Sequence, residues 1–431
     1  MAPLGRYALA ALLALLAAIG FRATVIPLRT NGLGLVLRTI AATTPTGDNN
    51  ELVDLLTAPR PFKRTYTGVA ALDRHLSLLV GFFAAYINDA GAGWDATAFY
   101  VWGLGQFAAG WTALVLEGRR TGSKGRAIAW VGVVGVLFQN LGWTFVAPLY
   151  LALHLLTSPV ARIGERQGKV NGGGGEIGVG DAARRSLFVY LWDLALLPMA
   201  MTIGFVLPTV FMSLPKVLGH SAATHYNWVA FWQPFPVWTL IILDVLHNAC
   251  YFLLGSLTPQ DTNGKPTTPG NGFLVAISGV YQYCLTISVA TQLPVLLVAA
   301  LPSPLRASLS SLFPQLAPFL SHVTFWRTFV PYPISASPSL ADPLAYGPGD
   351  LAPLLIQFFQ YDMYIGNAAL LLWAFYLHVA TAQKSLVRSL RVAVQWTLLG
   401  GPTGGAVALL WDRDEVVRVG ESEVGGEDKT K

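Results

Sequence analysis

Three aspartates stand inside long apolar stretches, and they are the residues best placed to do chemistry. Asp193, Asp244 and Asp362 each lie mid-run, in stretches that contain no Lys or Arg. A carboxyl group at bilayer depth costs about 3 kcal/mol or more, so such residues face a bundle interior and are functional candidates. An unpaired buried carboxyl keeps its proton, because burial disfavours the charged form. The sequence therefore predicts three candidate catalytic groups, a general acid with partners or a base.

Aromatic residues accompany these acids at helical spacing. Phe358 and Phe359 lie four and three positions before the last of the three acids, which places them on its face of a helix, and Tyr361 directly precedes it. Tyr190 stands three positions before the first acid. Aromatic faces stabilise a nearby cation through their quadrupole. We therefore expect these four side chains to line a substrate site.

The stretch 232–238 interrupts an apolar run with two prolines, which should kink a helix there. One interpretation is a belt of aromatic residues at the membrane interface. The other is a kink that opens a pocket, with Trp232 and Phe235 against the substrate. His247 and Asn248 follow Asp244 at helical spacing and could orient it or relay a proton.

Structural roles compete with these hypotheses. Each acid could simply hydrogen-bond a neighbouring helix and fix the packing. Glu117, with Arg120 three positions later, predicts a surface ion pair at the end of a helix. The pair His220 and His225 is too small a ligand set for a metal site, and no glycine-rich phosphate loop is present, so we expect neither a metal nor a cofactor.

Composition places the acids in a membrane protein. Hydrophobic residues make up 53% of the 431 residues and charged residues only 12%, about half of what a soluble domain carries. About 20 apolar residues cross a bilayer. Windows of that length occupy residues 96–116, 127–160, 186–215, 226–259, 266–305, 351–383 and 392–411. Residues 7–21 and 76–87 are shorter candidates. The predicted fold is an all-α, polytopic transmembrane helical bundle with seven to nine spans.

The chain divides around this bundle. We expect an N-terminal signal anchor or first transmembrane helix (1–30), a polar loop (31–75), the helical bundle (76–411) and a charged disordered tail (412–431). Within the bundle, 161–185 predicts a flexible loop and 306–350 a Pro/Ser-rich loop. No internal repeat is visible. The net charge of +5 lies in short clusters between apolar runs, which indicates contact with membrane lipids and no nucleic-acid partner.

The sequence does not determine the orientation of the bundle in the membrane. The loop 119–126 and the loop 161–185 are both basic, and the positive-inside rule would place both in the cytosol. A single crossing by residues 127–160 would put them on opposite sides.

Several short motifs stand out between about residues 70 and 380. They are Gln139-Asn140-Leu141-Gly142, Ala147-Pro148-Leu149-Tyr150, His154-Leu155-Leu156-Thr157-Ser158-Pro159, the stretch 232–238, Gln360-Tyr361-Asp362 and Leu372-Trp373-Ala374. In these motifs the chain resembles the fungal integral-membrane terpene cyclases of meroterpenoid biosynthesis, of the ascochlorin and ascofuranone type that cyclise an epoxyfarnesyl chain.

The resemblance implies a metal-independent, acid-initiated cyclase. A neutral aspartate would protonate the terminal epoxide, or an alkene, of a farnesyl chain attached to an aromatic or polyketide headgroup. Asp362 is the first candidate for the donor, with Asp244 and Asp193 as partner or base. The resemblance also implies a lipophilic prenylated substrate, a multi-pass location in the endoplasmic reticulum, and an upstream prenyltransferase and epoxidase.

The alternative is a proton-coupled exporter of a lipophilic metabolite, in which the same acids relay protons. Transporters commonly show two related halves with helices broken at matching places. Only the Pro234/Pro236 break is visible in the sequence, which favours the cyclase.

Overall fold

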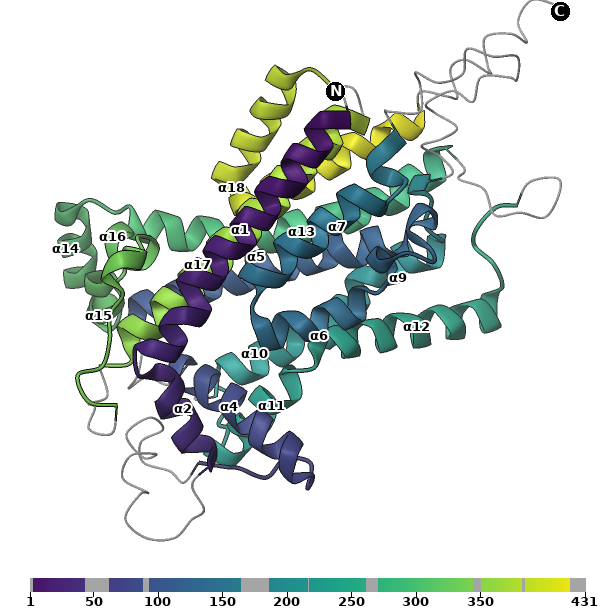
Figure 1. The fold of residues 1–431 in the computed structure, drawn as a ribbon. Helices are drawn as coiled ribbons and strands as arrows, with labels where there is room; N and C mark the ends of the chain where they lie inside the picture. Colours follow the sequence, from purple (N-terminus) through teal and green to yellow (C-terminus); the bar gives the residue numbers. More distant parts are fainter. Residues whose placement is uncertain are drawn as a thin grey trace, which may run out of the picture.

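The computed structural model describes residues 3–42, 62–87, 93–163, 186–215, 217–260, 270–343, 350–381 and 384–418. Within these ranges the elements are all helices, which confirms the all-α prediction (Figure 1). Seven of the described helices are long and apolar enough to cross a membrane, the lower limit of the expected seven to nine. They are α1 (Pro3–Thr30), α4 (Ala70–Ile87), α5 (Gly93–Arg119), the rod formed by α9 (Leu191–Met201), a π-turn (Thr202–Val206) and α10 (Leu207–Ser213), then α12 (Phe235–Leu254), α13 (Gly270–Ala299) and α17 (Ala352–Thr381).

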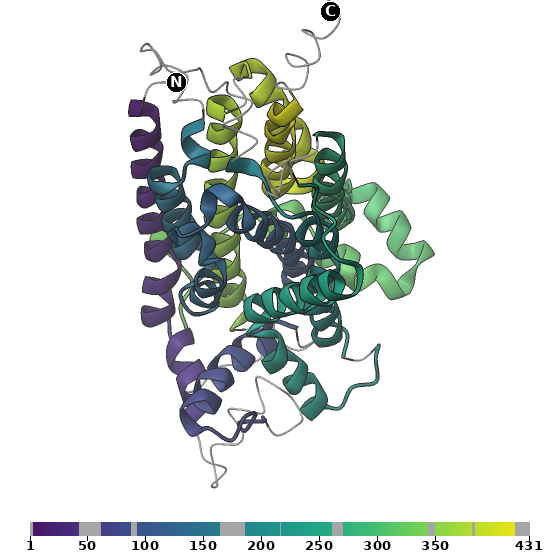
Figure 2. The ribbon, with the colours of Figure 1, turned by 90° about the vertical axis from the view of Figure 1, so that its right-hand side faces the viewer.

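Shorter helices connect and cover these rods. They are α2 (Leu33–Ala42), α6 (Val131–Leu141), α7 (Trp143–Thr157), α11 (Ala222–Trp232), α14 (Ser303–Leu312), α15 (Ala317–His322) and α16 (Phe325–Phe329). α2 lies in the segment 31–75 expected to be a polar loop, and α14–α16 lie in the expected Pro/Ser-rich loop. The loop 161–185 falls outside the described residues after residue 163. Figure 2 shows α14 and α15 projecting from the side of the bundle away from α1.

Two of the predicted spans are broken by glycine, so the prediction of one continuous crossing is wrong for each. Residues 127–160 form α6 and α7, separated at Gly142 with φ +87°. Residues 392–411 lie in α18 (Leu386–Asp414), whose backbone leaves the helical conformation at Gly401 with φ +73°. Only glycine adopts this left-handed region without a steric penalty, so each glycine lets the chain turn sharply between two helical segments.

Both broken helices turn back on themselves. The Arg126 guanidinium, just before α6, donates to the carbonyl of Thr157 at the end of α7 (2.9 Å). Arg388 near the start of α18 pairs with Asp412 near its end (2.9 Å). Each is therefore a hairpin that enters and leaves at one end of the bundle. We call this the basic end, because Arg119, Lys124 and Arg162 also lie there.

These hairpins remove the conflict over orientation. Since α6 and α7 do not cross as one helix, Arg126 before them and Arg162 after them lie on the same side of the bundle. The opposite end, which we call the far end, carries α2 and the start of α4, away from the start of α1 (Figures 1 and 2).

Two contacts of the same kind join a broken helix to a long one. Thr144, two residues after the Gly142 break, donates its backbone N–H to Asp362 of α17 (2.9 Å). Thr403, two residues after the Gly401 break, donates its backbone N–H to Gln106 of α5 (3.1 Å). In both places the start of a helical segment after a glycine break therefore packs against a polar side chain of a long helix.

The C-terminal boundary differs from the prediction. α18 continues through Asp414 into a short 3-10 turn (Glu415–Arg418), so residues 412–418 are helical and not part of a disordered tail as expected. Arg413 and Asp414 are fully buried, and the ion pairs that each makes offset the cost of removing its charge from water. Residues 419–431 lie outside the described part.

Candidate active site

Asp362 lies near the middle of α17 and is 7% exposed. Its Oδ1 accepts the Thr144 N–H, and the backbone N–H of Trp143 also hydrogen-bonds to this carboxyl. The first N–H groups of a helix have no partner within the helix, and the N-terminus carries a partial positive charge. The carboxyl thus sits on the positive end of α7, which stabilises the carboxylate formed when its proton leaves.

A cavity of about 50 Å³ adjoins this carboxyl, and its walls are mainly aromatic. We call it the inner cavity. Besides Asp362 it is lined by Phe83, Leu104, Phe107, Phe138, Gln139, Trp143, Trp232, Phe359 and Met363. The rings pack edge to face, with centroids 4.8 Å apart for Phe138 and Trp143 and 5.0 Å for Phe83 and Trp232. Such walls stabilise a cation in the space between them.

The structure distributes the predicted aromatic residues unevenly around this cavity. Trp232 and Phe359 line it. Phe235 stands directly behind the wall, with its ring centroid 5.1 Å from that of Trp232. Phe358 packs instead on Phe82 (5.3 Å between centroids) and lies outside the lining.

Tyr361 also points elsewhere, since its hydroxyl donates to the carbonyl of Tyr332 (2.8 Å). A residue adjacent to the acid is turned by about 100° around the helix, so it cannot share the acid's face. The stretch 232–238 is not a kinked helix: α11 ends at Trp232 and α12 begins at Phe235. At this break Trp232 lines the inner cavity, and its contact with a substrate stays a prediction.

Asp193 and Asp244 lie together, but away from Asp362. Asp193 is in the first turn of α9 rather than mid-helix, and its Oδ1 lies 2.7 Å from His247 Nδ1. Asp244 pairs with Arg119 (2.6 Å), and its side chain is 54% exposed. The sequence predicted no counter-ion because Arg119 belongs to a distant segment.

These two acids line a polar cavity of about 770 Å³ at the basic end. Tyr190 lines the same cavity, with the Lys124 ammonium 4.6 Å from its ring centroid. His247 approaches Asp193, not Asp244 as expected, and Asn248 bonds to the backbone carbonyl of Asp244. The predicted set of three acids is thus divided between two cavities.

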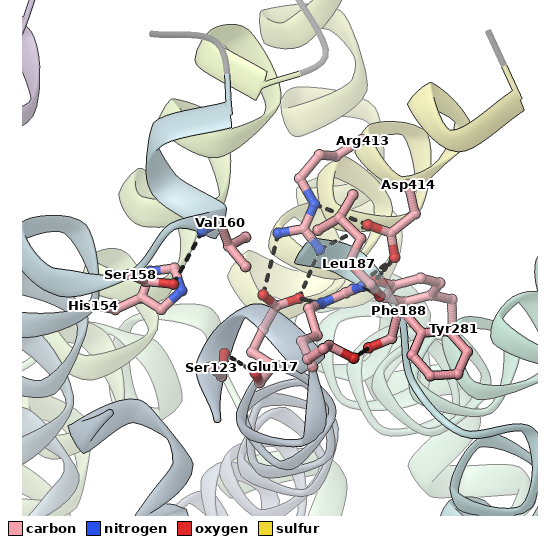
Figure 3. Close-up of polar contacts among 12 residues, drawn as sticks. Glu117, Ser123, His154, Ser158, Val160, Leu187, Phe188, Tyr281, Arg413 and Asp414 are labelled. Carbon is pink, nitrogen blue, oxygen red and sulfur yellow. Dashed lines mark hydrogen bonds and ion pairs between the residues drawn. The ribbon is translucent and has the colours of Figure 1, made fainter. Parts of the chain in front are cut away.

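A fully buried network of ion pairs lies at the basic end (Figure 3). Glu117 binds Arg120 (2.7 Å) and Arg413 (2.7 Å), and Asp414 binds the same two guanidinium groups (2.7 and 2.8 Å). Tyr281 donates to Asp414 (2.7 Å). The expected surface pair of Glu117 with Arg120 exists but is buried, because α18 covers it.

This network serves to position helices. Burial by itself lowers the pKa of Arg120, but the carboxylates of Asp414 and Glu117 outweigh burial and hold that pKa above its usual range. Glu117 is occupied by two guanidinium groups, so it has no free proton to donate. The network joins α5, α13 and α18 at the basic end.

Several residues of the inner cavity were missed by sequence reasoning. Gln139 carries part of the family resemblance, as does Gly142 at the break before Trp143, but residue type alone gave none of the three a role. The available signal was a glycine inside an apolar run, which indicates a break. Phe83, Phe107 and Phe138 had no distinguishing neighbours in the sequence.

The described fold and inner cavity are those of a polytopic membrane protein with an acid at an aromatic-walled pocket. The chain belongs to the CtvD domain family, whose model matches residues 9–418.

Its relatives carry the name terpene cyclase. The chain is 27% identical to terpene cyclase ascI of Acremonium egyptiacum over 371 residues, covering 84% of this chain and 82% of that protein. It is 23% identical to terpene cyclase ctvD of Aspergillus terreus (82% and 86% covered) and 24% identical to terpene cyclase atmA of Aspergillus flavus (81% and 83% covered). No solved structure matches the chain. The resemblance to fungal terpene cyclases is therefore confirmed, and the chain is an enzyme of this class.

Proposed function

We propose that this membrane enzyme cyclises a farnesyl chain attached to an aromatic or polyketide headgroup, in meroterpenoid biosynthesis, by protonating a terminal epoxide with Asp362. The observation that carries the proposal is the position of this carboxyl. It lies on the positive end of α7 and at the wall of an aromatic cavity. Membership of a family with terpene cyclase relatives supports the same reaction class.

In this mechanism Asp362 both donates the first proton and accepts the last one. Asp362 gives its proton to the epoxide oxygen, the bond from that oxygen to the tertiary carbon breaks, and the oxygen becomes a hydroxyl. The α7 N–H groups stabilise the carboxylate left behind. Alkenes of the chain then attack the cation in turn. The last cation loses a proton to the Asp362 carboxylate, so the product is an isomer of the substrate.

The aromatic walls supply the second requirement. Trp143, Trp232 and Phe359 surround the space in which a carbocation would form. Their faces stabilise positive charge, and their bulk keeps water from capturing it. A cavity of about 50 Å³ is smaller than such a substrate, so these side chains move apart when it binds. We propose that the substrate arrives in the endoplasmic reticulum membrane from a prenyltransferase and an epoxidase.

One structural finding bears on the exporter hypothesis. Helices broken at Gly142 and Gly401, each packed against a long helix, are similar to the paired broken helices of transporters. The sequence showed only the Pro234/Pro236 break, so this finding weakens the sequence argument against an exporter. Family membership is what favours the cyclase, and turnover separates the two functions.

Membranes containing the native protein or Asp362→Asn, incubated with an epoxyfarnesyl phenol, provide the test. Asparagine keeps an oxygen for the Thr144 N–H but has no acidic proton. We expect a cyclised product of unchanged mass from the native protein and a loss of about 100-fold or more in the variant, the range of a general acid.

The matched control is Asp244→Asn, which removes a half-exposed acid at the basic end. It should retain turnover. If Asp244→Asn abolished cyclisation and Asp362→Asn did not, the donor would lie in the polar cavity. If the native protein exported the phenol unchanged, the cyclase proposal would be rejected.

A further inference from the structure

A second, larger cavity adjoins the inner cavity on the side of the far end. It measures about 770 Å³, a typical size for a ligand pocket, and we call it the outer cavity. Its apolar wall includes Leu72, Leu76, Leu79, Val136 and Trp238, and the proposed chemistry makes no use of it.

The two cavities lie next to each other along the elements that form them. On α4, Leu76 and Leu79 line the outer cavity and Phe83, one turn further, lines the inner one. At the end of α11, Gln233 lines the outer cavity and Trp232 the inner one. Gln139 of α6 lines both. From Leu72 to Phe83 the helix rises about 16 Å, so one elongated molecule can occupy both spaces.

At this junction one amide atom on each of two glutamines is buried and lacks a partner among the described residues. Gln233 is 3% exposed, and its Nε2 donates to the carbonyl of Val229 (3.2 Å), which leaves Oε1 buried with no donor. Gln139 Nε2 is buried and has no acceptor. A buried polar atom without a hydrogen-bond partner destabilises the protein by about 1–3 kcal/mol. A ligand that forms hydrogen bonds with both of these atoms removes this penalty and therefore binds more tightly.

The outer cavity also contains a cation. The Lys63 ammonium donates to Asn227 Oδ1 (2.7 Å) on the cavity wall, and His75 and Asn140 lie on the same wall. The site therefore presents a cation, amide groups that can donate, and one free acceptor. An aromatic headgroup with a hydroxyl to donate and oxygens to accept matches this set.

We infer that the outer cavity is the headgroup subsite of the enzyme and that it takes a hydroxylated aromatic ring, whose hydroxyl donates to Gln233 Oε1 while the chain extends past Gln139 to Asp362. This inference rests on the proposed function and adds where the headgroup binds. It makes the headgroup a determinant of substrate affinity, remote from the bond that reacts.

The test compares two substrates on one variant. Gln233→Leu keeps the volume but removes the free acceptor. With an epoxyfarnesyl phenol we expect kcat/KM to fall about tenfold, the value of a single hydrogen bond, through KM. With an epoxyfarnesyl benzene, whose ring has no hydroxyl, we expect no change. Gln315→Leu, a matched change at an exposed position, should alter neither.

A binding measurement keeps this inference separate from catalysis. The un-epoxidised farnesyl phenol cannot react, and its Kd for the Asp362→Asn protein should rise about tenfold when Gln233→Leu is added. Equal losses on both substrates, or an unchanged Kd, would overturn the headgroup subsite. Absence of turnover with a tenfold Kd effect would instead count against the proposed reaction and leave the subsite standing.

Discussion

At the level of single residues, Asp362 has two surroundings with opposite effects. The aromatic walls favour the neutral acid, and the N–H groups of Trp143 and Thr144 favour the carboxylate. An acid placed in this way can release a proton and have its charge stabilised within the same contact. Gln106 makes a contact of the same kind, because it accepts the Thr403 N–H after the Gly401 break, but its amide side chain cannot ionise.

Gly142 is the residue on which this contact depends. A Cβ at this position would lie 2.7 Å from Asp362 Oδ1, and φ is +87°. Gly142→Ala should therefore lower turnover about 100-fold by displacing the carboxyl, and destabilise the fold by about 1–2 kcal/mol. Product formation and thermal unfolding of the purified protein measure the two effects.

Gly279→Ala is the matched control, because a Cβ at Gly279 of α13 meets nothing within 4 Å. It should leave both quantities unchanged. Full activity in Gly142→Ala would show that the carboxyl does not need its contact with α7.

At the level of helices, the sequence predicted positions of apolar segments better than their continuity. Residues 127–160 carry no charge, so nothing in composition distinguishes one crossing from a hairpin. The partner that fixes the turn, Asp362, is far away in the chain. At Gly401-Pro402 the sequence did indicate a break in the helix. Proline is favoured at the first position of a helix, and glycine is common where a helix is interrupted.

The candidate site was predictable to a similar extent. Asp362, Phe359 and Trp232 could be found from acid and aromatic residues within an apolar run. The burial of Glu117 could not, because it results from α18 packing over α5. For Asp193 and Asp244, the separation from Asp362 is likewise a property of helix packing and not of spacing.

The buried ion network joins the end of α5 to the end of α18. Arg413→Ala leaves Glu117 and Asp414 with one fewer counter-charge in a dry site, so we expect a loss of about 3–5 kcal/mol in stability. Thermal unfolding in detergent measures it. Adding Glu117→Gln should recover part of the loss, because it removes a charge left in excess.

Arg388→Ala is the comparison, since that side chain is 54% exposed in its pair with Asp412. An exposed pair contributes at most about 1 kcal/mol. If Arg388→Ala and Arg413→Ala destabilised the protein equally, burial would not be what gives the network its strength.

At the level of the whole molecule, the two hairpins determine which loops share a side of the membrane. Cysteines placed at Lys124 and Arg162 should react together with a membrane-impermeant maleimide, since the hairpin α6–α7 returns to the basic end. By the positive-inside rule we expect this side to be cytosolic. A cysteine at Thr67, at the far end, should react only after permeabilisation.

The labelling uses a Cys250→Ser background, because Cys250 is half-buried and Cys284 is buried. Intact microsomes expose the cytosolic face. Labelling of Lys124→Cys and Arg162→Cys from opposite faces would show that residues 127–160 cross the membrane after all.

The two contacts at the glycine breaks have a consequence for stoichiometry. Asp362 with Thr144 and Gln106 with Thr403 are contacts of the same kind, but only the first includes a side chain that can carry an acidic proton. On the proposed mechanism each polypeptide therefore holds one proton donor, and a titration with a tight inhibitor should reach saturation at one molecule per chain.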